Sequence, residues 1–405
     1  MKKNISIRVM IEINSCEVCG NQKLISVLDL GGHPLCDDLV LIGDNRVCKE
    51  YPIEILFCDT CYTAHQRFQV PKHELFKSNY HYRARMTGSV LTGMLDLVEN
   101  CKKRFGKIEG KLVLDVGCND GSLLNYFRDK GCDTVGIEPT DAANESSHTT
   151  FQTYFNMDSA TKFLDKFGSP DFITFTNVFA HIGKLPELLD SLRLLVTEKT
   201  IIVIENHYLG AILQTEQFDT YYHEHPRTYS HNSFKYIAKS LGLEMLDAQY
   251  VSRYGGNIRV YLGLGQAKSI PGTDETKFKD QFSKLRDDIE TWKINTNIWI
   301  IKHVEKHGKI RAKAFPGRAA ILIKLLGLDE SHISAVYEIK GSIKVGHYVP
   351  GTRIPILPEA DLYDLENQDE PILNLAWHIP GEVRANLALN GYAGEVLDIK
   401  AMNAG

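Results

Sequence analysis

Three features are missing from this sequence, and each absence excludes a class of protein. There is no apolar run long enough to span a bilayer, and no secretory signal is recognisable. There is also no basic block, and the net charge is −5, whereas a nucleic-acid-binding surface needs clustered positive charge. We therefore predict a cytoplasmic protein that binds neither membranes nor nucleic acids and is a monomer or a small homo-oligomer.

The composition is that of an ordinary globular protein with a sizeable core. Of the 405 residues, 43% are hydrophobic and 24% are charged, and the length predicts two or three domains. Nine cysteines are present, an odd number, and several lie within the α/β pattern described below. Cysteines used in this way favour a reducing compartment over a framework of disulfides.

The most informative stretch is residues 111–139, KLVLDVGCNDGSLLNYFRDKGCDTVGIEP. Its apolar run at 112–114 predicts a buried parallel strand, followed by a turn and a helix. Gly117 and Gly121 bracket the turn, and a second short strand ends on Glu138. Glycines let the backbone approach a ligand closely, and an acid at the end of the second strand can accept hydrogen bonds from two ribose hydroxyls.

The turn discriminates between two cofactors. It departs from G-x-G-x-x-G because Asn119 occupies the middle position, and Asp115 closes the first strand. An acid beside the turn would repel the pyrophosphate of a dinucleotide, whereas S-adenosylmethionine carries an amine and a sulfonium that carboxylates tolerate. The alternative is a glycine turn with a purely structural role. The predicted ligands of S-adenosylmethionine are Asp115, Gly117, Asn119, Gly121, Glu138 and, after a later strand, Asn177.

Two C-x-x-C pairs, Cys16 with Cys19 and Cys58 with Cys61, form a second constellation. Each pair can make a tight knuckle, and together four thiolates can surround one zinc ion tetrahedrally. Two disulfides are the alternative, which a reducing compartment disfavours, and a redox motif would need a different βαβ context. Four sulfurs leave no open position for water, so the predicted zinc is structural.

Acid/base groups gather where two later strands are expected to end. Strands at 171–175 and 201–205 run into His181 and His207, and open α/β sheets bind ligands at the carboxyl ends of their strands. A histidine at such a place often has only a structural role, as a hydrogen-bonded residue that lines the cleft. The segment 218–225 adds Tyr222, His223, Glu224 and His225. A pair H-x-H without a third spaced ligand is a weak metal signal, so we favour proton chemistry.

In the last third of the sequence, from about residue 255, predicted helices and strands alternate again. Its expected elements are a long polar helix at 277–305 and strands near 310–314, 333–339 and 372–377. Arg318 lies in a glycine turn that enters a helix, where it could hold a diphosphate, although a simple helix start explains the turn equally well. His347, in the loop at 346–352, is a further candidate for substrate binding, together with His207.

In combination, these motifs resemble the sugar C-methyltransferases that act on nucleotide-linked keto-deoxysugars. The resemblance spans the chain and rests on the two C-x-x-C pairs, LDVGCNDGSLL, GIEP, NVFAHI, FDTYYHEH, GGNIRVY and GHYVPGTRIPI. It implies an α/β protein with a zinc-binding lobe at 1–75 and a central Rossmann-like S-adenosylmethionine domain at 76–252. A second Rossmann-like domain at 253–405 would help to bind the nucleotide-sugar.

The resemblance also implies roles for particular residues. Those expected to line the sugar are His225, Glu224, Tyr222, His181 and an upstream tyrosine, either Tyr80 or Tyr82. Three segments depart from the family's pattern, at 83–85, at Pro226-Arg227 and at 315–318, and all are expected where substrate is recognised. The methyl-transfer residues match, so the departures point to an unusual acceptor.

The expected reaction follows from the chemistry of a keto-sugar. A base removes the proton next to the ketone, and the enolate carbon attacks the methyl group of the sulfonium. His225 is the predicted base, Glu224 would hold its tautomer, and His181 and Tyr222 would donate hydrogen bonds to the enolate oxygen. The alternatives are an O-methyltransferase, in which the same histidine deprotonates a hydroxyl, and a non-catalytic nucleotide-sugar-binding protein, which the intact glycine turn disfavours.

Overall fold

The computed structural model describes residues 10–75, 83–267 and 274–401, and of His73 only the backbone. The candidates Tyr80 and Tyr82 lie outside the described residues. The chain forms two compact units, each built from separate stretches of sequence. The first unit takes its described residues from Met1–Ser26, Leu56–Thr215 and Glu224–Lys279, and the second from Val27–Ile55, Glu216–His223 and Asp280–Gly405. The division into three domains stays a prediction.

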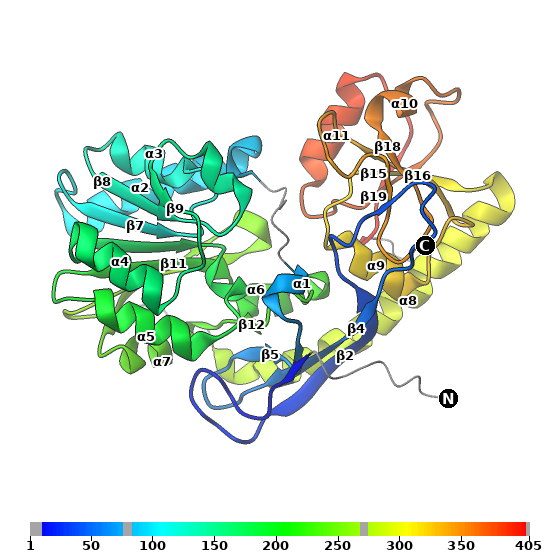
Figure 1. The fold of residues 1–405 in the computed structure, drawn as a ribbon. Helices are drawn as coiled ribbons and strands as arrows, with labels where there is room; N and C mark the ends of the chain where they lie inside the picture. Colours follow the sequence, from blue (N-terminus) through cyan, green and yellow to red (C-terminus); the bar gives the residue numbers. More distant parts are fainter. Residues whose placement is uncertain (1–9, 76–82, 268–273, 402–405) are drawn as a thin grey trace. The chain divides into compact units, whose positions relative to one another are not determined.

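A seven-stranded sheet of order β13-β14-β11-β10-β7-β8-β9 forms the centre of the first unit (Figure 1). Its strands are β7 (Leu112–Val116), β8 (Asp133–Ile137), β9 (Thr149–Phe151), β10 (Phe172–Thr176), β11 (Ile201–His207), β13 (Glu244–Val251) and β14 (Asn257–Gly263). From β9 to β11 the strands are parallel, while β14 pairs antiparallel with β11 and with β13. The strand order reverses between β7 and β10, and open α/β sheets bind ligands at such a point.

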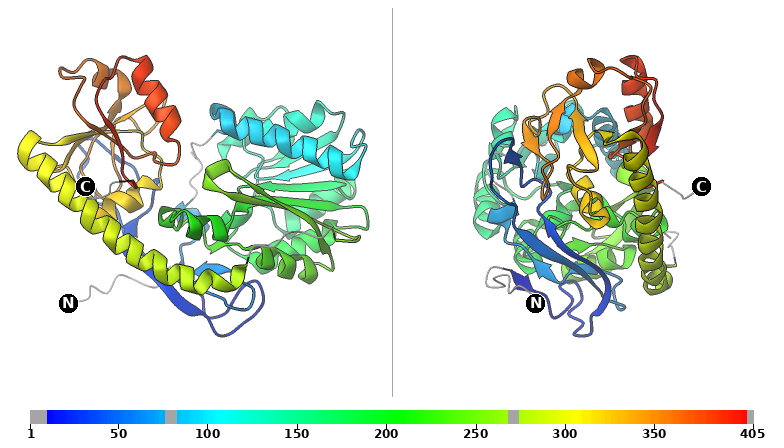
Figure 2. Two further views of the ribbon diagram at one scale, coloured as in Figure 1. Left: turned by 180° about the vertical axis from the view of Figure 1, so that it is seen from behind. Right: turned by 90° about the vertical axis from the view of Figure 1, so that its right-hand side faces the viewer.

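Helices cover both faces of this sheet (Figures 1 and 2). One face carries α2 (Gly88–Phe105) and α3 (Ser122–Arg128), and the other carries α4 (Met157–Phe167), α5 (Leu185–Leu195) and α7 (His231–Ser240). The buried side of α2 presents Val90, Met94, Leu97, Val98 and Cys101, spaced three or four residues apart as an amphipathic helix requires. Both α4 and α7 begin with a capping box, at Asn156 and at Ser230, which satisfies their first backbone N–H groups.

Short strands surround the two C-x-x-C pairs. A four-stranded sheet has the order β12-β5-β4-β2, and β1 pairs with β6. These strands are β1 (Ile11–Glu12), β2 (Ile25–Pro34), β4 (Glu50–Phe57), β5 (Ala64–Gln66), β6 (Phe68–Gln69) and β12 (Arg227–Thr228). The short helices α1 (Lys72–Leu75) and α6 (Leu209–Gln214) belong to the first unit, whereas most of β2 and β4 belongs to the second. The two strands predicted between the cysteine pairs, at 27–30 and 53–57, lie within β2 and β4.

The second unit contains a parallel sheet of order β18-β16-β15-β19-β20. Its strands are β15 (Ile310–Lys313), β16 (Ile333–Glu338), β18 (Ile356–Pro358), β19 (Ile372–Asn374) and β20 (Val396–Asp398), and β3 (Val40–Leu41) pairs with β17 (His347–Tyr348). Its helices are α8 (Phe278–His307), α9 (Ala319–Leu326), α10 (Glu359–Tyr363) and α11 (Pro380–Leu389). The predicted α/β class is confirmed for both units. Within the described residues, no helix combines the length and the apolar character that crossing a membrane requires.

Candidate functional site

The glycine turn lies at the point where the strand order reverses. After β7 the chain adopts left-handed backbone at Gly117, Asn119 and Gly121, with φ of 73°, 51° and 77°. A Cβ added to Gly117 would lie 2.5 Å from Cγ2 of Val178, which follows β10, so only glycine fits there. Asn177, also after β10, has φ of 55°. The structure therefore brings together the turn and Asn177, which the sequence assigned to the same cofactor site.

Glu138, at the end of β8, holds the turn in place. It accepts hydrogen bonds from the Asn119 N–H (3.0 Å), the Thr140 N–H (2.9 Å) and the Thr140 hydroxyl (2.6 Å), and it is 5% exposed. A carboxylate offers about four acceptor positions, so these donors use three of them. These contacts give Glu138 a role in shaping the turn, and its hydrogen bonds to the ribose hydroxyls stay a prediction.

Replacing Glu138 with Ala should weaken binding of S-adenosylmethionine by roughly 10- to 150-fold, because hydrogen bonds to a charged group contribute about 1.5–3 kcal/mol. Isothermal titration calorimetry measures this change directly. Tight binding of NAD to the unaltered protein, without binding of S-adenosylmethionine, would overturn the assignment of the turn.

Asp115 lies within β7 and is 3% exposed. Its carboxylate accepts a 2.6 Å hydrogen bond from the Thr174 hydroxyl on the neighbouring strand β10. Burial and, to a smaller extent, the negative charge of Glu138 together raise the pKa of Asp115 to about 7, against the effect of this hydrogen bond. The carboxyl is therefore near half-ionised at neutral pH, and a cation bound beside it would favour the ionised form.

We expect S-adenosylmethionine to bind about tenfold more tightly at pH 8 than at pH 6, because Asp115 ionises between them and its charge attracts the cofactor's positive groups. The raised pKa means that the folded chain holds this proton more tightly than the unfolded chain does. Burial of Asp115 therefore costs stability as the pH rises from about 4 to 7. Asp115→Asn should flatten the pH dependence of the dissociation constant and raise the melting temperature of the cofactor-free protein at pH 8. An unchanged pH dependence in this variant would contradict the assignment.

Three predicted histidines meet at the carboxyl ends of β10 and β11. His181 ends the short helix η4 (Phe179–His181) that follows β10, and His207 ends β11. The ring of His225 lies 4.6 Å from that of His181 and 5.4 Å from that of His207, measured between centroids. Glu224 and His225 are 7% and 5% exposed, and Glu224 Oε2 lies 3.8 Å from His181 Nδ1. We name His181, His207, Glu224 and His225 the histidine cluster.

Burial lowers the pKa of His181 to about 4, although a backbone hydrogen bond with Glu224 opposes the shift. The ring is therefore neutral at pH 7 and can donate one N–H to a developing negative charge. The Glu224 carboxylate lies beside His181, and its predicted role in orienting His225 stays a prediction. Tyr222 and His223 belong to the second unit, where His223 Nε2 lies 3.1 Å from the Tyr51 carbonyl oxygen. The role of Tyr222 also stays a prediction.

A buried ionic network that the sequence reasoning missed supports this cluster. Glu205, two residues before His207 on β11, is fully buried and pairs with Arg253 and with Arg259, whose Nε lies 2.8 Å from Glu205 Oε2. The Asn257 amide donates to Glu205 (3.2 Å) and to the Asn177 side chain (2.9 Å). An acid in one apolar strand and an arginine in another indicate a buried ion pair, because a buried charge without a partner costs too much free energy.

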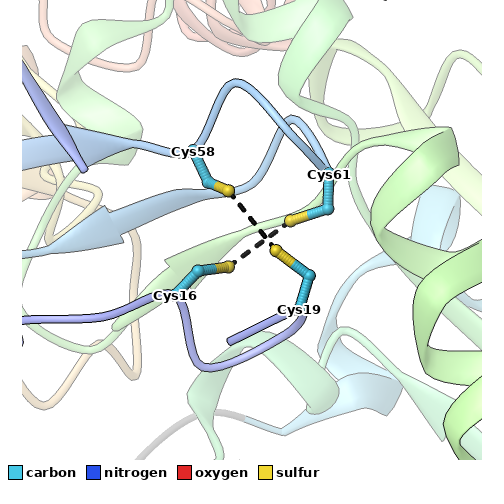
Figure 3. A group of neighbouring side chains, drawn as sticks. All are labelled: Cys16, Cys19, Cys58 and Cys61. Atoms are coloured by element: carbon cyan, nitrogen blue, oxygen red, sulfur yellow. Dashed lines mark hydrogen bonds between the residues drawn. The ribbon is translucent and has the colours of Figure 1, made fainter. Parts of the chain in front are cut away.

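The four cysteine sulfurs of the C-x-x-C pairs converge (Figure 3). All lie within 4.8 Å of one another, with Cys16 and Cys61 3.4 Å apart and Cys19 and Cys58 3.5 Å apart. A disulfide needs about 2.05 Å. Tetrahedral zinc with Zn–S bonds of about 2.3 Å needs sulfur–sulfur separations of about 3.8 Å, so the group fits zinc. His65 Nε2 lies 3.3 Å from the Cys16 sulfur, as an outer-shell hydrogen bond to a zinc thiolate would.

The two substrate candidates of the second unit are already engaged there. The Arg318 guanidinium forms two 2.7 Å bonds to Asp219, which is fully buried and also accepts a 2.9 Å bond from the Trp377 indole. A diphosphate would have to compete with this carboxylate. His347 is half-buried, and its Nδ1 lies 3.3 Å from the Val345 carbonyl oxygen. Both residues stay predictions.

Two of the segments that depart from the family's pattern have structural partners in the first unit. Arg83 and Arg85 both pair with Glu145, and the N–H groups of Ala84 and Arg85 donate to the side chains of Asn119 (3.0 Å) and Asp120 (3.1 Å). The segment 83–85 is therefore hydrogen-bonded to the glycine turn at 117–121. Arg227 was expected where substrate is recognised; the structure buries its guanidinium against Glu17, which lies between Cys16 and Cys19.

The sequence matches three families in the order in which these sites occur. Residues 16–76 match a zinc binding domain, residues 85–248 a methyltransferase domain, and residues 254–395 a C-methyltransferase C-terminal domain. Together with the glycine turn and the four-cysteine group, they define an S-adenosylmethionine-dependent methyltransferase with a zinc-binding site.

One curated relative also indicates which kind of methyltransferase the chain resembles. The chain is 26% identical over 399 residues to the C-methyltransferase NovU of Streptomyces niveus, covering 92% of each chain. The chain is therefore similar to a C-methyltransferase over most of its length, and its N-terminal part matches a zinc binding domain. Among solved structures, the magnesium protoporphyrin IX methyltransferase of Synechocystis PCC 6803 with bound SAH has a TM-score of 0.34 and 13% identity, covering 47% of this chain and 91% of that one. The PH0226 protein of Pyrococcus horikoshii OT3 has a TM-score of 0.35 and 11% identity, covering 48% and 98%.

Proposed function

We propose that this enzyme methylates a ring carbon of a nucleotide-linked 4-keto-deoxysugar through an enolate. The observation that carries the proposal is the histidine cluster, which lies at the same carboxyl edge of the sheet as the glycine turn. Similarity to NovU, named a C-methyltransferase, supports carbon as the nucleophile. None of the nine cysteines, all of them among the described residues, forms a disulfide, which fits a cytoplasmic location.

When bound, S-adenosylmethionine supplies an electrophilic methyl group on a positive sulfur. His225 removes the proton from the carbon next to the ketone. The electron pair of that C–H bond forms the C=C bond of the enolate, and the π pair of the C=O bond moves onto the ketone oxygen. Neutral His181 donates its N–H to this oxygen, which stabilises the enolate without adding a second charge to a buried site. The enolate carbon then forms the new bond to the methyl group as the methyl–sulfur bond breaks, and His225 retains the proton until the product leaves.

The proposal is tested with a panel of nucleotide-linked keto-sugars incubated with S-adenosylmethionine. We expect a product heavier by one methyl group, with a C–CH₃ signal in its NMR spectrum. Without cofactor, the enzyme should exchange the acidic C–H of the substrate with deuterium from D₂O, because enolate formation precedes methyl transfer. A methyl ether as the product would contradict the proposal and favour an O-methyltransferase.

A further inference from the structure

Arg227 follows the catalytic candidate His225 by two residues, yet it is 1% exposed. Together with Thr228 it forms β12, which pairs antiparallel with β5, so that Arg227 lies opposite His65. The N–H of Gln66 donates to the Pro226 carbonyl (2.9 Å). The segment after His225 is therefore part of the small sheet beside the zinc-binding cysteines, since β5 begins three residues after Cys61.

One end of the Arg227 guanidinium contacts the first cysteine knuckle. Its Nη1 donates a 2.7 Å hydrogen bond to Glu17, which lies between Cys16 and Cys19. The same Glu17 oxygen accepts a 2.8 Å hydrogen bond from the Gln69 amide. The Arg227–Glu17 pair is thus a largely buried hydrogen bond between an arginine and an acid next to a zinc ligand, and such bonds are the stronger kind.

The other donors of Arg227 contact the loop that carries His181. Nη1 also donates to the Gly183 carbonyl (3.0 Å), and Nη2 donates to the Ile182 carbonyl. These two residues follow His181 directly. A planar guanidinium holds several N–H donors in a fixed arrangement, so it can bind one carboxylate and two carbonyls at the same time. The loops that hold His181 and His225 therefore meet at one side chain.

We infer that Arg227 is a positioning residue that sets His181 against His225 and, through Glu17, fastens both loops to the zinc knuckle. Its partners among the described residues are Glu17, the Tyr229 hydroxyl and the two carbonyls, so it acts through other groups. The inference rests on the proposed roles of His181 and His225. It also explains the departure Pro226-Arg227 as a structural device rather than a change of substrate.

The test compares Arg227→Lys and Glu17→Gln with the control Arg67→Lys, which alters a more exposed pair with Glu12 in the same part of the chain. We expect kcat to fall roughly 10- to 100-fold in the first two variants, because a misplacement of about 1 Å near the chemistry costs up to about 10² in rate. KM and the dissociation constant of S-adenosylmethionine should stay within about threefold, and zinc near one per chain. The double variant should be no slower than the slower single variant, since both act on one pair.

A second readout is independent of the reaction. In protein with isotope-labelled histidine, the ring signals of His181 and His225 should shift in Arg227→Lys and Glu17→Gln, but not in Arg67→Lys. Folded, zinc-loaded Arg227→Lys with unchanged kcat and unchanged ring signals would refute the inference, as would a loss of melting temperature alone. Should Arg227→Lys fail to fold, Glu17→Gln decides by the same measurements. If the wild-type enzyme methylates oxygen, the proposed function is refuted. The ring signals and kcat of the variants still test whether Arg227 is a positioning residue.

Discussion

Replacing His225 with Asn is expected to lower the rate of methyl transfer by roughly 10²–10⁴-fold, the usual contribution of a general base. Deuterium exchange into the keto-sugar should be lost in parallel, because both require removal of the same proton. The dissociation constant of S-adenosylmethionine should change little, since the cofactor is assigned to the turn after β7, whereas His225 precedes β12. Single-turnover kinetics and NMR of the exchanging C–H measure the two effects separately.

The control for this variant is His231→Asn, a histidine six residues further along at the start of α7 and outside the histidine cluster. It should keep both activities. A fully active His225→Asn variant would refute the assignment of the base and pass that role to Glu224, Tyr222 or His181. The pH–rate profile adds a constraint: because burial lowers the pKa of His181 to about 4, we expect a loss of activity between pH 5 and 7 to come from another group.

Much of the fold could be predicted because each element has a local signal. The strand, turn, helix and strand of residues 111–139 are present as β7, α3 and β8, because an apolar run bounded by glycines has few other ways to fold. The strands of the last third lie within a few residues of their predicted ranges. The grouping into two units was not predictable in this way. It depends on which distant stretches pack together, so that residues 27–55 join the C-terminal unit.

The candidate site was predictable where it follows from topology. Carboxyl ends of adjacent parallel strands meet at one edge, so residues after β10 and β11 had to lie close together, and His181 and His207 both contact His225. The partners in the supporting contacts were not predictable, although a charged residue inside an apolar strand signals that it needs a partner. Glu205 and Arg259 pair across β11 and β14, and Glu17 and Arg227 are 210 residues apart in sequence. Neither pairing leaves a periodic pattern.

Removing one zinc ligand should affect stability more than chemistry. We expect Cys58→Ala to lose most of its bound zinc and roughly 3 kcal/mol of unfolding free energy, about a quarter of the 10–16 kcal/mol typical of structural zinc sites. Cys58 is fully buried, and all four sulfurs converge, so zinc held by them has no open position for a reacting water. Metal analysis by mass spectrometry and a thermal melt measure the two losses.

The matched control is Cys101→Ala, which removes a fully buried thiol from α2, far in sequence from the four zinc ligands. It should lose stability through the cavity it leaves, yet keep about one zinc per chain, because its sulfur is outside the four-cysteine group. In Cys58→Ala, the dissociation constant of S-adenosylmethionine should stay within about threefold at a temperature where the chain remains folded, since the glycine turn is built on β7, β8 and β10. Active, folded wild-type protein without zinc would refute the metal assignment. Full zinc retention in Cys58→Ala would instead show that three thiolates and another side chain suffice.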